Sequence, residues 1–222
     1  MELQTDIPSV CADKLIKQEV DLALIPVAAI PKVPNAEIIS DYCIGTKGTV
    51  RTVCIYSDCP IEDIDVLYLD YHSRTSVALT KILVEEYWKI KPLLLDASPG
   101  YIDKIEGTSA GLVIGDRTID LENRFSYTYD LGEIWEQHTG MPFVFAAWVS
   151  NRTLDPAFIK AFNAALDYGL AHINELMLIL PSPAPGFDLK TYFTHYISYE
   201  LDRPKRQALD LFLNKIQVNT LG

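Results

Sequence analysis

Seven consecutive residues, 70–76 with the sequence DYHSRTS, combine side chains that bind anions. Ser73, Thr75 and Ser76 supply hydroxyl groups, and Arg74 supplies a guanidinium that binds a carboxylate through parallel hydrogen bonds. The segment lies between an apolar run and an amphipathic one, so we expect it at the start of a helix, where free N–H groups and the dipole favour an anion. A plain helix cap is the alternative, but three hydroxyls beside an arginine favour a carboxylate site.

Four residues elsewhere in the chain are further candidate substrate contacts. Thr108 and Ser109 lie in the small-residue run GTSAG, where a ligand can approach the backbone closely, although an ordinary turn explains this run nearly as well. Ser9 is expected at the start of a short helix and Ala28 at the end of a strand, and backbone donors face ligands at such places. A purely structural role explains Ser9 and Ala28 at least as well.

Charged residues near the ends of strands form a third candidate group. Asp116 and Arg117 follow the run GLVIG, and we expect an ion pair that supports the site without touching the ligand. His72 is the only histidine within a candidate site, so His72 and Ser73 are the candidate catalytic residues. The other histidines and the cysteines lack metal-ligand spacing, and the motifs of NTPases, dehydrogenases, serine hydrolases and zinc proteases are absent. The sequence therefore predicts no metal site.

Short apolar segments rich in β-branched residues alternate with longer segments of helical periodicity, a pattern that indicates an α/β protein. The clearest unit is a strand over 65–70 that leads into a helix over 73–88. Other strands are expected over 21–27, 37–44, 49–57, 91–96, 111–116 and 143–149, and other helices over 156–178 and 204–216.

The order of these elements fits a protein of two lobes, with the chain crossing twice between them. Lobe one then comprises residues 1–57 plus 142–222, and lobe two comprises residues 58–141. We expect a Venus-flytrap arrangement of mixed sheets with crossover helices. Such folds bind ligands in the cleft between the lobes, where a helix from each lobe can point backbone N–H groups at an anion.

Composition narrows the classes of partner. The formal net charge of -11 opposes binding to nucleic acids or anionic membranes, because phosphate backbones are bound by clustered lysines and arginines. No run of about 18 apolar residues and no signal-like start are found, so we expect a cytoplasmic protein with four reduced cysteines. Monomer and homodimer remain equally open.

Several stretches of the chain resemble the futalosine-pathway menaquinone-biosynthesis proteins and, within them, the chorismate dehydratases. The resemblance implies a type-II periplasmic-binding-protein fold without export, and dehydration of chorismate to 3-[(1-carboxyvinyl)oxy]benzoate with no metal or organic cofactor. The matching stretches are 6–9, 21–29, 40–45, 50–53, 69–79, 115–117 and 140–148.

For the site, the resemblance implies a grip on the two carboxylates of chorismate. Residues 73–76 would hold one carboxylate, and first-lobe donors near Ser9 or Ala28 would hold the other. Two groups remain candidates for the general base: His72 and the enolpyruvyl carboxylate of the substrate itself.

The resemblance leaves two rival functions open. One is the sister enzyme of the pathway, which releases a dihydroxynaphthoate, and the other is a non-catalytic protein that binds small anions. Relatives also begin with a strand that ends in a Ser-Tyr-Leu-Asn-like segment, and this sequence starts after that point. We therefore expect the 222-residue form to be impaired in activity or stability relative to an N-terminally extended one.

Overall fold

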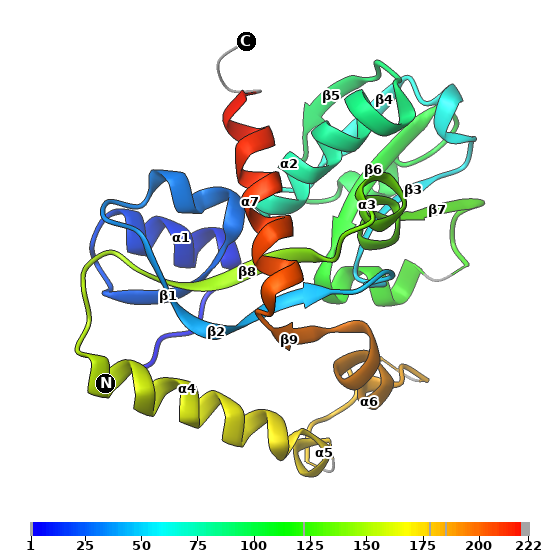
Figure 1. Ribbon diagram of the computed structural model, residues 1–222. Helices are drawn as coiled ribbons and strands as arrows, with labels where there is room; N and C mark the ends of the chain where they lie inside the picture. Colours follow the sequence, from blue (N-terminus) through cyan, green and yellow to red (C-terminus); the bar gives the residue numbers. More distant parts are fainter. Residues whose placement is uncertain (1, 122, 178, 185, 219–222) are drawn as a thin grey trace.

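The chain folds into two sheets with their own helices in the computed structural model, which describes residues 2–121, 123–177, 179–184 and 186–218 (Figure 1). In chain order the elements are α1 (Pro8–Ile16), β1 (Leu22–Pro26), η1 (Val27–Lys32), β2 (Glu37–Thr46), β3 (Val53–Ser57), η2 (Ile61–Asp63), β4 (Val66–Leu69), α2 (Arg74–Ile82), η3 (Leu83–Trp88), β5 (Leu93–Asp96), η4 (Tyr101–Lys104), β6 (Ser109–Ile114), η5 (Gly115–Leu121), β7 (Tyr127–Asp130), α3 (Leu131–Thr139), β8 (Phe143–Ser150), α4 (Pro156–Ala171), α5 (Ile173–Leu176), α6 (Leu189–Thr191), η6 (Tyr192–Tyr196), β9 (Ser198–Glu200) and α7 (Arg203–Val218). None of the described helices combines the length and apolar composition needed to cross a membrane.

The first sheet has the strand order β1-β8-β2-β9, and its paired strands are antiparallel. Its central strand β8 is almost wholly apolar, as its burial by neighbours on both sides requires. Because β8 comes late in the chain and β2 early, the sheet joins two distant parts of the sequence. This sheet forms the core of lobe one.

The second sheet has the order β5-β4-β6-β3-β7, with β4 parallel to both β5 and β6. Strand β3 runs antiparallel to β6 and to β7. The carboxyl ends of β4, β5 and β6 therefore meet at one edge, where crossover units place binding groups. Helix α2 begins at this edge, directly after β4.

Strand pairing places one segment differently from the sequence expectation. The expected boundary of lobe two, at residue 58, left the strand over 53–57 in lobe one. The structure pairs β3 with β6 and β7, so this strand belongs to the second sheet. The first crossing between the lobes is then 47–52 and the second is 140–142. We propose lobe two as approximately residues 53–139.

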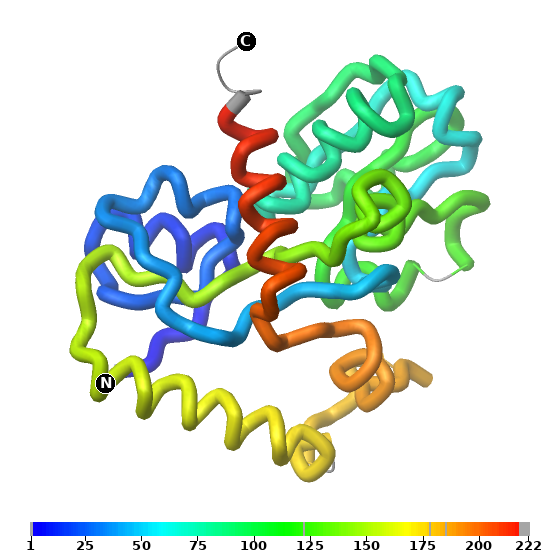
Figure 2. Tube along the Cα trace, in the orientation of Figure 1, coloured from blue at the N-terminus to red at the C-terminus, as the bar shows by residue number. Residues whose placement is uncertain are grey.

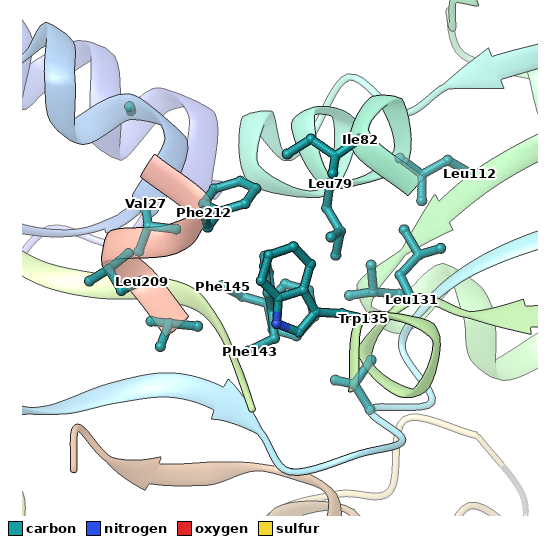
Figure 3. Packing of buried hydrophobic residues seen from close by; sticks show 14 of the residues in the cluster. Val27, Leu79, Ile82, Leu112, Leu131, Trp135, Phe143, Phe145, Leu209 and Phe212 are labelled. Carbon is teal, nitrogen blue, oxygen red and sulfur yellow. The ribbon is translucent and has the colours of Figure 1, made fainter. Parts of the chain in front are cut away.

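Apolar packing continues from one lobe to the other. Trp135 of α3, Phe143 of β8 and Phe212 of α7 stack edge to face, with ring centroids 5.2 Å apart for Trp135–Phe143 and 5.1 Å apart for Phe143–Phe212. Figure 3 shows Leu79 of α2 and Leu131 of α3 beside these rings. Truncating a buried ring of this kind to alanine costs about 3–5 kcal/mol. The two lobes therefore share one hydrophobic core near the crossings.

Helix α7 runs between the N-terminal segment and α2, as Figure 2 shows, and it contacts both η1 and α2. The helix expected over 204–216 is confirmed by α7. The one expected over 73–88 is α-helical to Ile82 and continues as a wider π-helical turn. The helix expected over 156–178 is divided at His172 into α4 and α5, and residue 178 lies outside the described residues.

Glu86 of η3 joins three helices beside the shared core. Its carboxylate accepts a hydrogen bond from Lys215 of α7 and lies 3.2 Å from Nε2 of His138 in α3. Burial alone would raise the pKa of Glu86, but the hydrogen bonds from Lys215 and His138 outweigh it and hold the pKa below its usual value. The ionised carboxylate therefore stabilises the folded state.

We expect Glu86→Gln to lower the melting temperature at pH 7 by about 3 °C, the effect of losing about 1 kcal/mol. A lowered folded pKa gives stability that is complete above the unfolded pKa, near 4.5, and disappears as the pH falls through the folded value. Melting curves of both proteins should therefore converge below pH 4.5. The exposed neighbour provides the control Glu85→Gln, and an equal loss in that variant would contradict the role of Glu86.

Candidate functional site

The helix start predicted from the sequence is present, and Ser73 is its N-cap. Ser73 has extended backbone angles, and its Oγ accepts hydrogen bonds from the backbone N–H of Ser76 at 3.2 Å and from the Ser76 hydroxyl at 3.1 Å. The capping role weighed as an alternative is therefore real. The backbone N–H groups of Arg74 and Thr75 make no hydrogen bond within the described part of the chain, so the helix end retains free donors.

The first turn of α2 is docked on lobe one through two polar contacts. Thr75, which is fully buried, accepts a hydrogen bond at its Oγ1 from the backbone N–H of Ala28 in η1 at 3.2 Å. Arg74 forms an ion pair with Asp13 of α1, with 2.6 Å between Nη2 and Oδ1. Both predicted anion-binding groups therefore already have partners from the opposite lobe.

Asp70 organises the approach to this helix start. The residue is 2% exposed, and its Oδ2 accepts hydrogen bonds from the Tyr101 hydroxyl at 2.8 Å and from Arg117 at 2.5 Å. Its Oδ1 accepts the backbone N–H of His72 at 2.7 Å. Arg117 also lies over the ring of Tyr71, 5.4 Å from the centroid. One carboxylate thus fixes the turn between β4 and α2.

The expected pairing of Arg117 with Asp116 is wrong. Asp116 is exposed, whereas Arg117 reaches the buried carboxylate of Asp70. Both charged groups gain more from this pairing, because a buried carboxylate without a partner is costly. Arg117 does not line the cleft, and it pairs with Asp70, which does.

The cleft between the lobes has a volume of about 1150 Å³ and lies against α2. Among the predicted residues, Ala28, Ser73 and Arg74 line it. Thr75 and Ser76 are buried in the docked helix start and do not line it. The remaining lining residues come from η1, from the ends of β4 and β5, from α2 and from α7: Pro31, Lys32, Asp70, Tyr71, Val77, Ala78, Lys81, Ile82, Asp96, Ile216 and Gln217.

Thr108 and Ser109 are at the wrong end of the sheet for the predicted contact. Ser109 pairs with Val66 at the start of β4, whereas the cleft lies beyond the end of that strand. Four residues of extended chain separate Val66 from Asp70, about 13 Å. Ser9 also does not line the cleft, and it does not cap α1, because the N-cap is Ile7.

His72 lies beside the cleft without lining it. Its ring packs edge-on against Tyr71, with centroids 4.5 Å apart. Partial burial and the positive charge of Arg117 lower the pKa of His72 below its usual 6.5. The imidazole is therefore neutral at pH 7 and has the protonation state of a base, but the geometry does not bring it to the lining.

A second cavity of about 290 Å³ lies at the first crossing between the lobes. Asp130, one of its lining residues, caps α3 and accepts the backbone N–H groups of Val50, Arg51, Gly132 and Glu133. The carboxylate is thus saturated by protein donors.

Asp13, Lys32, Lys81 and Asp96 are charged residues at or beside the cleft that the sequence did not single out. Asp13 lies in the first helix and meets Arg74 only because the lobes close, which no local pattern reveals. The spacing of Lys81 seven residues after Arg74, on one face of α2, was the available signal. Within the described residues, no group of three or more His, Cys, Asp or Glu side chains is placed to hold a metal ion.

We expect Asp70→Asn to lower the free energy of unfolding by about 2–3 kcal/mol, because Arg117 and Tyr101 lose a buried acceptor. Denaturant titration measures the change. The exposed Asp116→Asn is the matched control and should change the free energy by less than about 0.5 kcal/mol. Equal effects of the two substitutions would refute the assignment of Asp70 as the organising carboxylate.

Comparison with proteins of known structure confirms the predicted fold. The structure of a protein from Archaeoglobus fulgidus matches with a TM-score of 0.74, over 99% of this chain and 86% of that one, at 16% identity. An ABC transporter protein from Parabacteroides distasonis matches with a TM-score of 0.60, over 96% and 80%, at 20% identity. These likenesses show the fold alone, a two-lobed periplasmic-binding-protein-like architecture with mixed sheets.

Sequence comparison extends the likeness to a family. A curated chorismate dehydratase from Thermus thermophilus is 27% identical over 206 residues, covering 79% of this chain and 71% of the relative. The family profile described as menaquinone biosynthesis matches residues 1–217. The resemblance noted in the sequence is thereby confirmed, and the chain belongs to the menaquinone biosynthesis family.

Proposed function

We propose that this protein is a chorismate dehydratase, which removes water from chorismate to give 3-[(1-carboxyvinyl)oxy]benzoate. The observation that carries the proposal is the cleft at the start of α2. Arg74 lines it, pairs across the lobes with Asp13, and has a backbone N–H with no partner among the described residues. Membership of the menaquinone biosynthesis family and the likeness to the Thermus thermophilus enzyme support it. A biosynthetic step of this kind agrees with the cytoplasmic location expected from the sequence.

One carboxylate of the substrate is proposed to bind at the helix start. The free N–H group of Arg74, a residue that lines the cleft, lies at the positive end of the helix dipole. The Arg74 guanidinium is 36% exposed, so it can add a charge-assisted hydrogen bond by leaving or sharing Asp13. The ring would then rest on the apolar side chains of Val77, Ala78 and Ile82, which line the same cleft.

The proposed dehydration requires little of the protein beyond positioning the substrate. The ring C–H beside the enol ether loses a proton, its electron pair forms a ring double bond, and the neighbouring hydroxyl departs to complete water. The product ring is aromatic, so the driving force lies within the substrate. The protein must hold the ring in one orientation and exclude water, which are roles of a closed interlobe cleft.

We propose that the enolpyruvyl carboxylate of the substrate accepts the ring proton. This assignment is supported by the cleft lining, in which Asp70 is committed to Arg117 and Tyr101, and from which His72 is absent. Asp96 is the other carboxylate that lines the cleft. It lies at the end of β5, on the strand next to β4.

The decisive test is incubation of the purified chain with chorismate, followed by chromatography of substrate and product. We expect loss of chorismate with equimolar formation of the benzoate product. Binding without conversion would identify a non-catalytic anion-binding protein. Conversion of a cyclised futalosine derivative to a dihydroxynaphthoate, with chorismate untouched, would identify the sister enzyme. Either result would overturn the proposal.

Arg74→Gln should raise the KM for chorismate by about 10- to 100-fold, because it removes a charge-assisted hydrogen bond worth about 1.5–3 kcal/mol. Arg124→Gln is the matched control, since Arg124 pairs with Asp103 and does not line the cleft. An unchanged KM in Arg74→Gln would place the carboxylate elsewhere.

His72→Ala should reduce kcat by less than about tenfold, because the imidazole does not line the cleft. The acid limb of the pH profile should be the same in both proteins. If His72 were the base, its lowered pKa would place a loss of activity below pH 6.5, and that limb would vanish in the variant. A loss of kcat of about 100-fold or more, with binding intact, would make histidine the base.

A further inference from the structure

We propose that Lys32 and Lys81, one from each lobe, form a second carboxylate subsite in the cleft. This inference rests on the proposed function and specifies how the second carboxylate of a dianionic substrate is recognised. Both lysines line the cleft, Lys32 as the last residue of η1 in lobe one and Lys81 on α2 in lobe two.

The charge inventory of the cleft singles out these two lysines. Asp70 is paired with Arg117, and Arg74 is paired with Asp13. Lys32 and Lys81 have no hydrogen-bond or ion-pair partner within the described part of the chain. Both lysines are exposed side chains that line one cavity of a protein whose net charge is -11. They leave a local positive field that favours an anion.

Helix geometry sets Lys81 apart from the first subsite. Lys81 lies seven residues after Arg74, which is two turns and about 10 Å farther along the axis on the same face. Val77 and Ala78 line the cleft between these positions. A ligand with a carboxylate at the helix start and a ring on this apolar stretch therefore presents its second carboxylate toward Lys81.

Lys32 makes the subsite dependent on lobe closure. It belongs to the same short helix as Ala28, whose N–H group is bonded to Thr75. The contact that docks α2 on lobe one therefore also brings Lys32 to the cleft. A monocarboxylate satisfies only the helix start, whereas a dicarboxylate contacts both lobes.

Asp96 is the negative group that also lines this cleft, at the end of β5. Its carboxylate repels an anion, which disfavours a second carboxylate beside Asp96. The cleft thus combines attraction at two places with repulsion at a third. Such an arrangement discriminates among ligands by the positions of their negative charges as well as by the number of those charges.

The test is calorimetric titration of two stable probes, 3-(carboxymethoxy)benzoate with two carboxylates and 3-methoxybenzoate with one. We expect the wild-type chain to bind the dicarboxylate more tightly, and Lys32→Gln and Lys81→Gln each to weaken that binding about tenfold. Binding of the monocarboxylate should not change. Lys32→Arg and Lys81→Arg should retain most of the affinity, and Lys160→Gln on exposed α4 is the matched control.

The outcomes separate this inference from the proposed function. Selective loss of dicarboxylate binding in the glutamine variants supports the subsite even if chorismate is not converted. If the chain converts chorismate but Lys32→Gln and Lys81→Gln both bind the dicarboxylate as tightly as the wild type, the subsite is overturned and the proposed function stands. Equal wild-type affinity for the two probes also overturns it. Melting temperatures of the variants verify that they are folded.

Discussion

The docking of the first turn of α2 on lobe one is the interaction on which the site depends. It consists of the Ala28–Thr75 hydrogen bond and the Arg74–Asp13 ion pair. The ion pair is partly exposed, with side chains 36% and 46% accessible, so it is worth no more than about 1 kcal/mol. A contact of this strength positions the start of α2 against lobe one and can still be exchanged for a ligand.

The apolar core and the docked helix have different roles: the core joins the lobes, and the polar contacts of the helix can exchange with a ligand. Trp135, Phe143 and Phe212 hold the lobes together at the crossings, in a buried cluster that does not line the cleft. The polar contacts lie farther out, where a substrate carboxylate can compete with Asp13 for Arg74. An arginine that is already held in an ion pair loses less conformational entropy on binding a ligand than a free, mobile arginine does. Under the proposed function, this arrangement prepares the cleft for a substrate carboxylate.

The sequence predicted the local features of the site well and its long-range partners poorly. The start of α2 follows from a capping serine before an amphipathic run, and both are local signals. The partner of Arg117 is Asp70, 47 residues away, and the partner of Arg74 is Asp13, 61 residues away, and neither spacing is encoded in a motif. Thr108 and Ser109 were misplaced because the direction of β6 relative to β4 decides which end faces the cleft. The edge of lobe two was missed because β3 is an apolar strand that either sheet accommodates.

The most direct measurement is a crystal structure of the chain with 3-[(1-carboxyvinyl)oxy]benzoate bound. Our account predicts one carboxylate at the start of α2, on the backbone N–H group of Arg74, with the Arg74 guanidinium turned from Asp13 to the ligand. A ligand seated instead in the smaller cavity beside Asp130, with the Arg74–Asp13 pair intact and the start of α2 empty, would contradict it.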